Sequence, residues 1–328
     1  MLLELFGEIF DRYVFWLMGK HRFSLRTPPD LLERLAELEP AGELRAAVNV
    51  GAVQALAIDP PASSPELKVP FRRWRCASPT GDDEVRGLLF GDQRARRGLL
   101  YVHGWLQPDY TGFAELAAYH VCRGTAVWCL ELPHHLTRTP PGELSGARFI
   151  SGDVGETLQS FIRGLAEVGV LLALLRQRHD EVLSLGHSLG GLLTGLHACL
   201  AAEPQHRAAL LTPAVDPLGI LAQSPLTTNV RADVLAQGIS YRQLEPILRP
   251  VNLLTYRPRC PASSILLVAA RSDQVIPLPL QRRLRDAWGC RYHEARTGHL
   301  GVMVPLALFR RPVGLWRRIV DHLCPLDN

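Results

Sequence analysis

The serine at position 188 has the clearest potential for chemistry, in the run Leu-Ser-Leu-Gly-His-Ser-Leu-Gly-Gly over residues 183–191. An apolar strand pattern precedes it and a helical pattern follows it. A serine on such a tight turn exposes its hydroxyl, and Gly186 and Gly190 are needed because side chains there would collide with neighbouring elements. The helix N-terminus favours the negative charge that develops during attack on a carbonyl. Ser188 is therefore predicted to be a nucleophile.

A backbone site for that negative charge is predicted from a second segment, Leu-Tyr-Val-His-Gly-Trp over residues 100–105. A His-Gly pair at the end of a strand places a backbone N–H beside the nucleophile. We expect this N–H, on Trp105, to form an oxyanion hole with the N–H of Leu189, the residue after the nucleophile. The loss of one such donor typically costs roughly 10²–10³ in rate.

An acid and a base follow the nucleophile in the order serine, acid, histidine. Asp273 and His299 each come after a strand pattern, so both are expected at the carboxyl edge of the sheet, where Ser188 lies. Because free serine is a poor nucleophile, His299 would accept its proton and later give it to the leaving group. Asp273 would hold the imidazole tautomer and stabilise the imidazolium. This chemistry requires no metal and no organic cofactor.

Other assignments of these roles stay open. Asp216 is a second position for the acid, and Asp273 could instead only cap a helix. His293 and His322 are alternatives for the base, although a predicted strand and the apolar final helix give them structural roles. Ser188 could also be a turn serine in a binding or scaffold protein that has kept the fold without catalysis.

Three histidines and an arginine near these segments are candidate substrate contacts: His103, His134, His135 and Arg138. His103 is expected mainly to support backbone, whereas the other three either contact substrate or order their loop. The histidines do not predict a zinc site, because no acidic or cysteine partner lies at a suitable spacing. No metal-binding or cofactor-binding residue is predicted.

These candidates need a scaffold in which strands and helices alternate, and the sequence beyond residue 70 has that pattern. Continuous apolar runs separated by helical stretches, such as 156–175, indicate a parallel sheet covered on both faces. Two weaker strands, at 71–76 and 84–90, are expected to pair antiparallel at its edge. The other predicted strands lie at 98–103, 126–132, 181–185, 208–211, 264–269 and, more weakly, 290–294.

The length of 328 residues, against roughly 100–200 for a typical domain, is compatible with one or two domains. The motifs favour one domain over 71–328, preceded by an N-terminal helical extension over 1–70. Residues from about 216 to 261 interrupt the alternation with helical pieces and several prolines. Because loops of this length inside a domain are usually functional, we interpret this segment as a lid insertion.

The serine turn, the His-Gly pair and the ordered acid and histidine together resemble the α/β-hydrolase superfamily of serine esterases and lipases, over roughly residues 71–328. The resemblance implies an α/β fold with a mostly parallel, doubly wound sheet. It also implies a carboxylic ester hydrolase that forms an acyl-enzyme on Ser188. A lipid-like ester and an acyl thioester are both open as substrates, and acyltransferase or peptidase chemistry on the same fold is the alternative.

The stretch over residues 130–151 further resembles a subgroup near the eukaryotic alpha/beta hydrolase domain-containing protein 18. The chain departs from many α/β-hydrolases in one loop. Where those relatives have Asp-x-x-Gly-x-Gly, it has Pro-His-His-Leu-Thr-Arg over residues 133–138. This loop shapes the acyl or leaving-group pocket, so the substrates of commoner relatives do not transfer to this chain.

The composition excludes several classes of protein. With 47% apolar and 21% charged residues, the chain is not disordered, collagen-like or a coiled coil. Its net charge of +4 comes from scattered arginines and its aromatic content is 7%, which does not favour nucleic-acid binding.

A basic cluster between Arg282 and Arg318 is expected to be solvated helix faces, with contact to anionic lipid as the alternative. The expected partner is a small-molecule acyl ester, and the sequence does not predict the oligomeric state.

The seven cysteines include no CxxC pair and are odd in number, which favours unpaired cysteines in a reducing cytoplasm. Residues 1–20 have helical apolar spacing interrupted by acidic residues, unlike a secretory signal. No run of ~18 uncharged apolar residues predicts a transmembrane helix. The N-terminal helix is expected to dock on the protein's own body, with peripheral membrane contact as the alternative.

Overall fold

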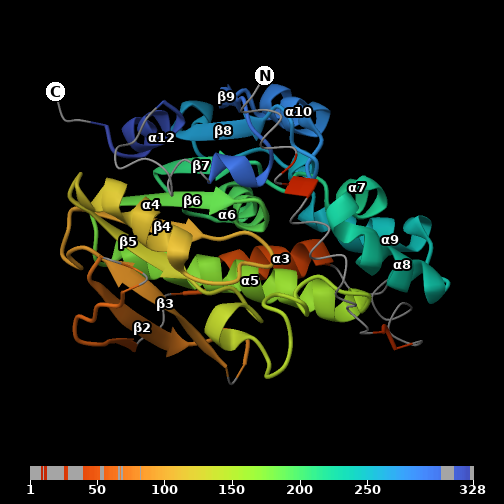
Figure 1. The fold of residues 1–328 in the computed structure, drawn as a ribbon, viewed down its shortest axis with the longest axis horizontal. Helices are drawn as coiled ribbons and strands as arrows, with labels where there is room; N and C mark the ends of the chain where they lie inside the picture. The colour runs from red at the N-terminus through yellow and green to blue at the C-terminus, as the bar shows by residue number, and fades with distance from the viewer. Residues whose placement is uncertain are drawn as a thin grey trace.

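The computed structural model describes residues 9, 11–12, 26–28, 40–51, 55–65, 67, 69–81, 83–303 and 314–325. Within these ranges the chain forms a nine-stranded sheet in the order β1-β2-β3-β5-β4-β6-β7-β8-β9, with helices on both faces (Figure 1). The strands are β1 (Leu56–Ile58), β2 (Phe71–Ala77), β3 (Glu84–Phe90), β4 (Arg97–Val102), β5 (Thr125–Leu130), β6 (Glu181–His187), β7 (Arg207–Leu211), β8 (Ile265–Ala270) and β9 (Arg291–Ala295).

The part of the sheet from β5 to β9 is parallel throughout. Its strands β5 and β8 are buried at every position, as a sheet covered on both faces requires. Each of the six runs predicted as parallel strands is found, with bounds that differ from the prediction by at most two residues at either end. The predicted fold class, an α/β fold with a mostly parallel sheet, is therefore confirmed.

The antiparallel edge extends further than the sequence predicts. β2 and β3 pair antiparallel as expected, and β3 pairs in the same sense with β5. The correction concerns β1, which pairs antiparallel with β2 although its residues lie in the segment 1–70 that was predicted as a helical extension. A strand of three residues has too short a pattern to read, and it forms here because the exposed edge of β2 offers unpaired backbone groups.

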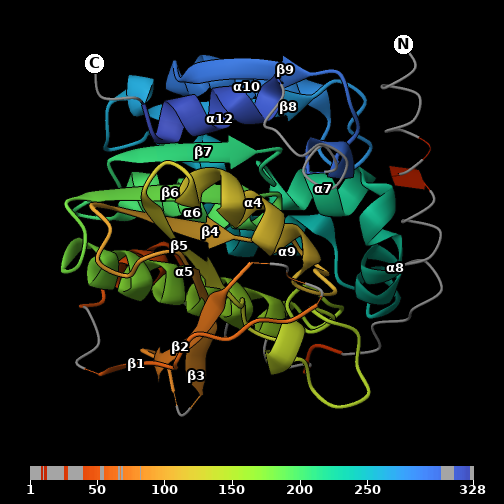
Figure 2. The same ribbon diagram turned by 60° about the vertical axis from the view of Figure 1, so that its left-hand side comes forward.

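Two apolar layers cover the two faces of the sheet (Figure 2). One layer is built by four helices: α3 (Pro40–Val48), α5 (Val154–Arg176), α6 (Leu189–Leu200) and α10 (Leu278–Trp288). The other is built by α4 (Thr111–Val121) and α12 (Leu315–Leu323). The sheet is thus doubly wound, and its strands are held rigidly enough to position side chains at their carboxyl ends.

Among the described residues, α5 is the one helix long and apolar enough to cross a membrane by length and composition. Its most apolar window has a mean hydropathy of 1.6, and 78% of that window is buried inside the protein. The helix packs between α3 and α6 over the centre of the sheet, where an apolar surface on all sides is expected for a core helix.

The predicted lid segment, residues 216–261, contains α7 (Pro217–Gln223), α8 (Thr228–Ala236) and α9 (Tyr241–Leu248), joined by short 3₁₀ turns. A capping box begins α9. Oγ of Ser240 accepts a hydrogen bond from the backbone N–H of Gln243, and Oε1 of Gln243 accepts one from the backbone N–H of Ser240. All three helices lie beyond the carboxyl ends of β6 and β7 (Figure 1). They can therefore form walls above the end of the sheet that carries Ser188.

Candidate active site

Ser188 lies on the turn between β6 and α6 with a strained backbone, φ 54° and ψ −112°. The surrounding geometry explains both flanking glycines. A Cβ on Gly190 would lie 2.0 Å from the carbonyl oxygen of Val102, and a Cβ on Gly186 would lie 2.3 Å from that of Gly190. A side chain at position 190 would therefore push the turn away from β4, and one at position 186 would push α6 away from β6, so the position of Ser188 depends on both glycines.

Ser188, His299 and Asp273 are brought together at the carboxyl edge of the sheet. The imidazole Nε2 of His299 is 3.0 Å from Ser188 Oγ, and its Nδ1 is 3.0 Å and 3.1 Å from the two carboxylate oxygens of Asp273. The three residues lie far apart in the sequence, and parallel strands bring them to one edge. All three side chains are largely buried, so their hydrogen bonds compete little with water.

The carboxylate of Asp273 is held by the loop after β8. Its Oδ1 accepts hydrogen bonds from the backbone N–H groups of Val275 and Ile276, both at 2.8 Å. Its Oδ2 is 3.2 Å from the amide nitrogen of Gln281, on α10. These donors orient the carboxylate towards the imidazole, so Asp273 both caps its own turn and contacts His299.

The electrostatics around His299 favour its protonated form. Burial alone would lower the pKa of its imidazole, but the charge and hydrogen bond of Asp273, with a further contribution from Asp11, raise that pKa above its usual value. The neighbouring His187 responds in the opposite direction, because burial lowers its pKa to about 3. Within this group, His299 is therefore the histidine able to take up a proton near neutral pH.

The segment predicted to supply the oxyanion hole passes directly beside the nucleophile. A Cβ on Gly104 would lie 3.3 Å from Cβ of Ser188. The indole of Trp105 donates to the carbonyl of Gly146 at 2.8 Å, which anchors this segment against the loop after β5. Leu189 is the first residue of α6, where a backbone N–H has no partner inside the helix. The two predicted N–H donors thus belong to segments that adjoin Ser188.

His103 and His135 are buried and bound to backbone. Nδ1 of His103 donates to the carbonyl of Gly104 at 2.8 Å, while its Nε2 accepts from the N–H of Leu132 at 3.2 Å. Nδ1 of His135 is 2.8 Å from the carbonyl of Pro133. Burial lowers the pKa of His103 to about 4 and holds that of His135 well below its usual value. Both are therefore neutral rings that order loops, the alternative that the sequence left open for His135.

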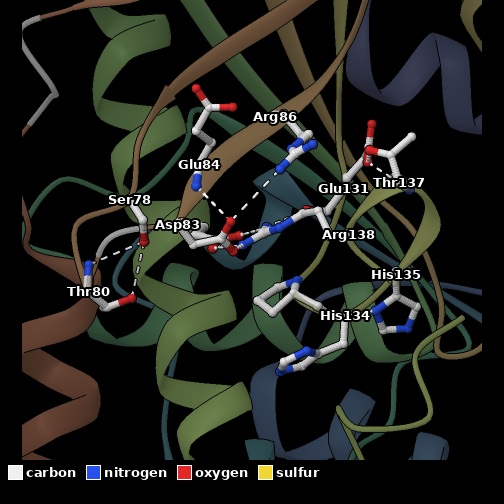
Figure 3. A network of polar contacts seen from close by, with 12 residues as sticks. Ser78, Thr80, Asp83, Glu84, Arg86, Glu131, His134, His135, Thr137 and Arg138 are labelled. Carbon is white, nitrogen blue, oxygen red and sulfur yellow. Dashed lines mark hydrogen bonds and ion pairs between the residues drawn. The ribbon is translucent and has the colours of Figure 1, made fainter. Parts of the chain in front are cut away.

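His134 and Arg138 also interact with protein groups. Nε2 of His134 is 3.1 Å from a carboxylate oxygen of Glu156, at the start of α5. Arg138 forms ion pairs with the buried Glu167 and with the more exposed Asp83, which Figure 3 shows beside it. Neither side chain lines the cavity described below, so this arrangement favours loop ordering. Within the described ranges, no three His, Cys, Asp or Glu side chains are grouped so as to hold a metal ion.

The alternative acid and bases have other contacts. Asp216 precedes α7, with its carboxylate beside Gly219. His293 lies in β9, and His322 on α12 contacts the carbonyls of Ala208 and Ser264, both at 3.1 Å. Asp273 is the carboxylate that meets Nδ1 of His299.

Ser188 lines a pocket that is partly open to solvent and holds about 760 Å³ of empty space, open solvent included. Trp105 and Leu189 line it beside the nucleophile, and its remaining wall is almost entirely apolar. That wall comes from the start of α5 and from the lid segment: Ile150, Val154, Phe161, Ile220, Leu221, Leu226, Val230, Val234, Leu244 and Leu248. Such a pocket can accept an apolar group next to the hydroxyl of Ser188.

One acidic residue at this site was not predicted from the sequence. Asp11 is completely buried, and its carboxylate accepts hydrogen bonds from the backbone N–H groups of His299 and Leu300. In the sequence it was only one of the polar residues opposite an apolar helix face, with no local signal of a distant partner. The rest of the N-terminal helix predicted over residues 1–20 lies outside the described residues, except for Ile9 and Arg12.

The seven cysteines are free, and five of them are buried. The basic cluster near the C-terminus lies on the surface where it is described. Arg282 and Arg271 pair with Glu294, and Arg317 pairs with Asp321, so part of its charge is neutralised locally. This agrees with the expectation of solvated helix faces, while Arg310 and Arg311 lie outside the described residues.

Comparison with known proteins places this geometry in a known fold. No family model and no curated protein matches the sequence. An acetyl xylan esterase from Paenibacillus sp. R4 superimposes with a TM-score of 0.56 at 13% identity, over 89% of this chain and 98% of that one. The Pyrococcus furiosus esterase Pf2001 superimposes with a TM-score of 0.51 at 13% identity, over 84% of this chain and 98% of that one. A Mycobacterium tuberculosis puromycin-hydrolyzing peptidase superimposes with a TM-score of 0.56 at 14% identity, over 81% of this chain and 41% of that one. The chain has the α/β-hydrolase fold.

Proposed function

We propose that this protein is a serine hydrolase that cleaves a carboxylic ester with an apolar acyl group, through an acyl-enzyme on Ser188. The observation that carries the proposal is the continuous contact from Asp273 through His299 to Ser188 Oγ, which lines an apolar pocket. A nucleophile, a base and an orienting acid within hydrogen-bond distance are the groups that acyl transfer requires.

In the first half-reaction, Ser188 Oγ bonds to the carbonyl carbon while its proton passes to Nε2 of His299. The carbonyl electron pair moves to oxygen, and the N–H groups of Trp105 and Leu189 stabilise the resulting oxyanion. Collapse of this intermediate breaks the bond to the leaving alcohol, which takes the proton from His299. The acyl group is then held as an ester of Ser188.

In the second half-reaction, His299 removes a proton from water as the water oxygen attacks the acyl-enzyme. Collapse breaks the bond to Oγ, returns the proton to Ser188 and releases a carboxylic acid. Asp273 stays ionised throughout and stabilises the imidazolium that forms in each half. The apolar walls bind the acyl group by excluding water, at about 25 cal/mol for each Å² of apolar surface buried.

The test combines a fluorophosphonate probe with a series of p-nitrophenyl esters of increasing acyl length. The control is Ser263→Ala, which removes an exposed hydroxyl just before the amino end of β8. This variant and wild type should be labelled equally and should hydrolyse the esters equally. Ser188→Ala should be unlabelled and lose activity by roughly 10⁴–10⁶-fold. A folded wild type that neither labels nor hydrolyses any ester would refute the proposal. Acyl transfer to an added alcohol in preference to water would indicate an acyltransferase instead.

A further inference from the structure

The carboxylate of Asp11 binds the backbone of the segment that carries the predicted base. Its Oδ2 accepts a hydrogen bond from the N–H of His299 at 2.6 Å, and its Oδ1 accepts one from the N–H of Leu300 at 3.0 Å. The side chain has no exposed surface. Both carboxylate oxygens are thus used on two consecutive backbone groups, from a residue 288 positions away in the chain.

These two hydrogen bonds satisfy donors that would otherwise be unpaired. His299 precedes a 3₁₀ turn over Leu300–Val302, and the first N–H groups of such a turn have no partner within it. A charged acceptor binds such groups more strongly than a neutral one. The contact therefore fixes the backbone of His299, and with it the direction in which the imidazole points.

We propose that Asp11 is a positioning residue for catalysis: it holds the His299 backbone so that Nε2 faces Ser188, and its negative charge stabilises the imidazolium. This inference rests on the proposed serine hydrolase function. It adds to the Asp273–His299 pair a second carboxylate, which acts on the backbone of the base instead of its ring. Asp11 would then take part in forming the active site.

The charges around His299 make this role measurable. Asp273 faces it from the loop after β8, Asp11 from the N-terminal segment, and His187 and Ser188 from the end of β6. Of these, the two carboxylates raise the pKa of His299. Burial raises the pKa of Asp11 itself, although its backbone hydrogen bonds and the charge of His299 oppose that effect. Removal of the Asp11 charge should therefore lower the pKa of the base.

The decisive variant is Asp11→Asn, which keeps the size of the side chain and one oxygen acceptor but removes the charge. We expect kcat to fall between roughly tenfold and hundredfold, as for small misplacements of reacting groups. KM should change little, because Asp11 does not line the cavity. The acid limb of the kcat/KM profile should move to lower pH. Asp11→Glu, which keeps the charge, should retain the wild-type position of that limb.

The matched control is Asp180→Asn, the same change on a side chain that is 81% exposed and precedes β6 at the opposite end from Ser188. It should leave kcat and the pH profile unchanged. If wild type hydrolyses the esters but Asp11→Asn keeps its kcat and its acid limb, the positioning role is wrong. If Asp11→Asn does not fold, a shifted acid limb in Asp11→Glu would overturn the inference and an unshifted one would support it. Failure of wild type to hydrolyse any ester would instead count against the proposed function.

Discussion

The guanidinium of Arg138 meets the carboxylate of Glu167 at two points, with Nη1 2.6 Å from Oε2 and Nη2 2.7 Å from Oε1. Both side chains are buried, and Arg138 also donates to the carbonyl of Glu131 and pairs with Asp83 (Figure 3). One arginine thus joins the loop after β5 to α5 and to the turn between β2 and β3. This loop contains the run Pro-His-His-Leu-Thr-Arg over residues 133–138.

The first prediction is that Arg138→Met destabilises the protein by about 3–5 kcal/mol, because it leaves the carboxylate of Glu167 buried without a partner. The double variant Arg138→Met with Glu167→Leu should regain most of that loss, since neither charge is then buried. Urea unfolding of the two variants and wild type measures both effects. The surface pair of Arg75 and Asp59 supplies the control, and Arg75→Met should cost under about 1 kcal/mol. A similarly small cost for Arg138→Met would contradict the assigned role.

The second prediction concerns Gly190, two residues after the nucleophile. Gly190→Ala should destabilise the protein by at least about 1–3 kcal/mol and strongly reduce fluorophosphonate labelling, because the added Cβ would meet the carbonyl of Val102 at 2.0 Å. Gly112→Ala, on α4, has no atom within 4 Å of the added Cβ and should be neutral or slightly stabilising. Thermal unfolding and labelling rates compare the two variants. Normal labelling of Gly190→Ala would mean that the turn tolerates a side chain.

The third prediction concerns acyl-chain selection by α8. Val234 lines the cavity, whereas its neighbour Leu235 is 48% exposed and lies outside it. Val234→Phe should therefore reduce kcat/KM for long acyl esters more than for acetate, since the larger ring occupies space that a long chain needs. The p-nitrophenyl ester series on both variants measures this ratio. Leu235→Phe should keep the wild-type ratio, and an equal response of both variants would argue against this wall as the acyl site.

The fourth prediction is a pH dependence with a defined sign. His299 must be neutral to accept the Ser188 proton, and its pKa is raised by Asp273 and Asp11 against the effect of burial. Activity should therefore be full above that raised pKa and fall as the pH decreases through it, at a pH above the ordinary histidine value of about 6.5. Burial keeps His103 and His187 neutral in this range. A kcat/KM profile that stays flat down to pH 5 would exclude His299 as the base.

The patterns along the chain were sufficient to predict the parallel sheet and the candidate residues Ser188, Asp273 and His299. The reason is that this information is local: an apolar strand, two glycines around a serine, and polar residues just after strands. Parallel strands bring their carboxyl ends to one edge, so residues that follow different strands meet there. The short edge strand β1 was missed, because its pairing depends on the edge of β2 and not on its own three residues.

Three features were decided by the tertiary structure alone. The carboxylate of Asp11 looks like one polar residue of an amphipathic helix, Glu167 looks like an exposed charge on α5, and the cavity residues look like core positions. Each acquires its role from residues more than twenty positions away: His299, Arg138, and the facing side chains of α5 and the lid segment. Spacing along one element reports which face is apolar, but only packing determines whether that face meets another element or surrounds a cavity.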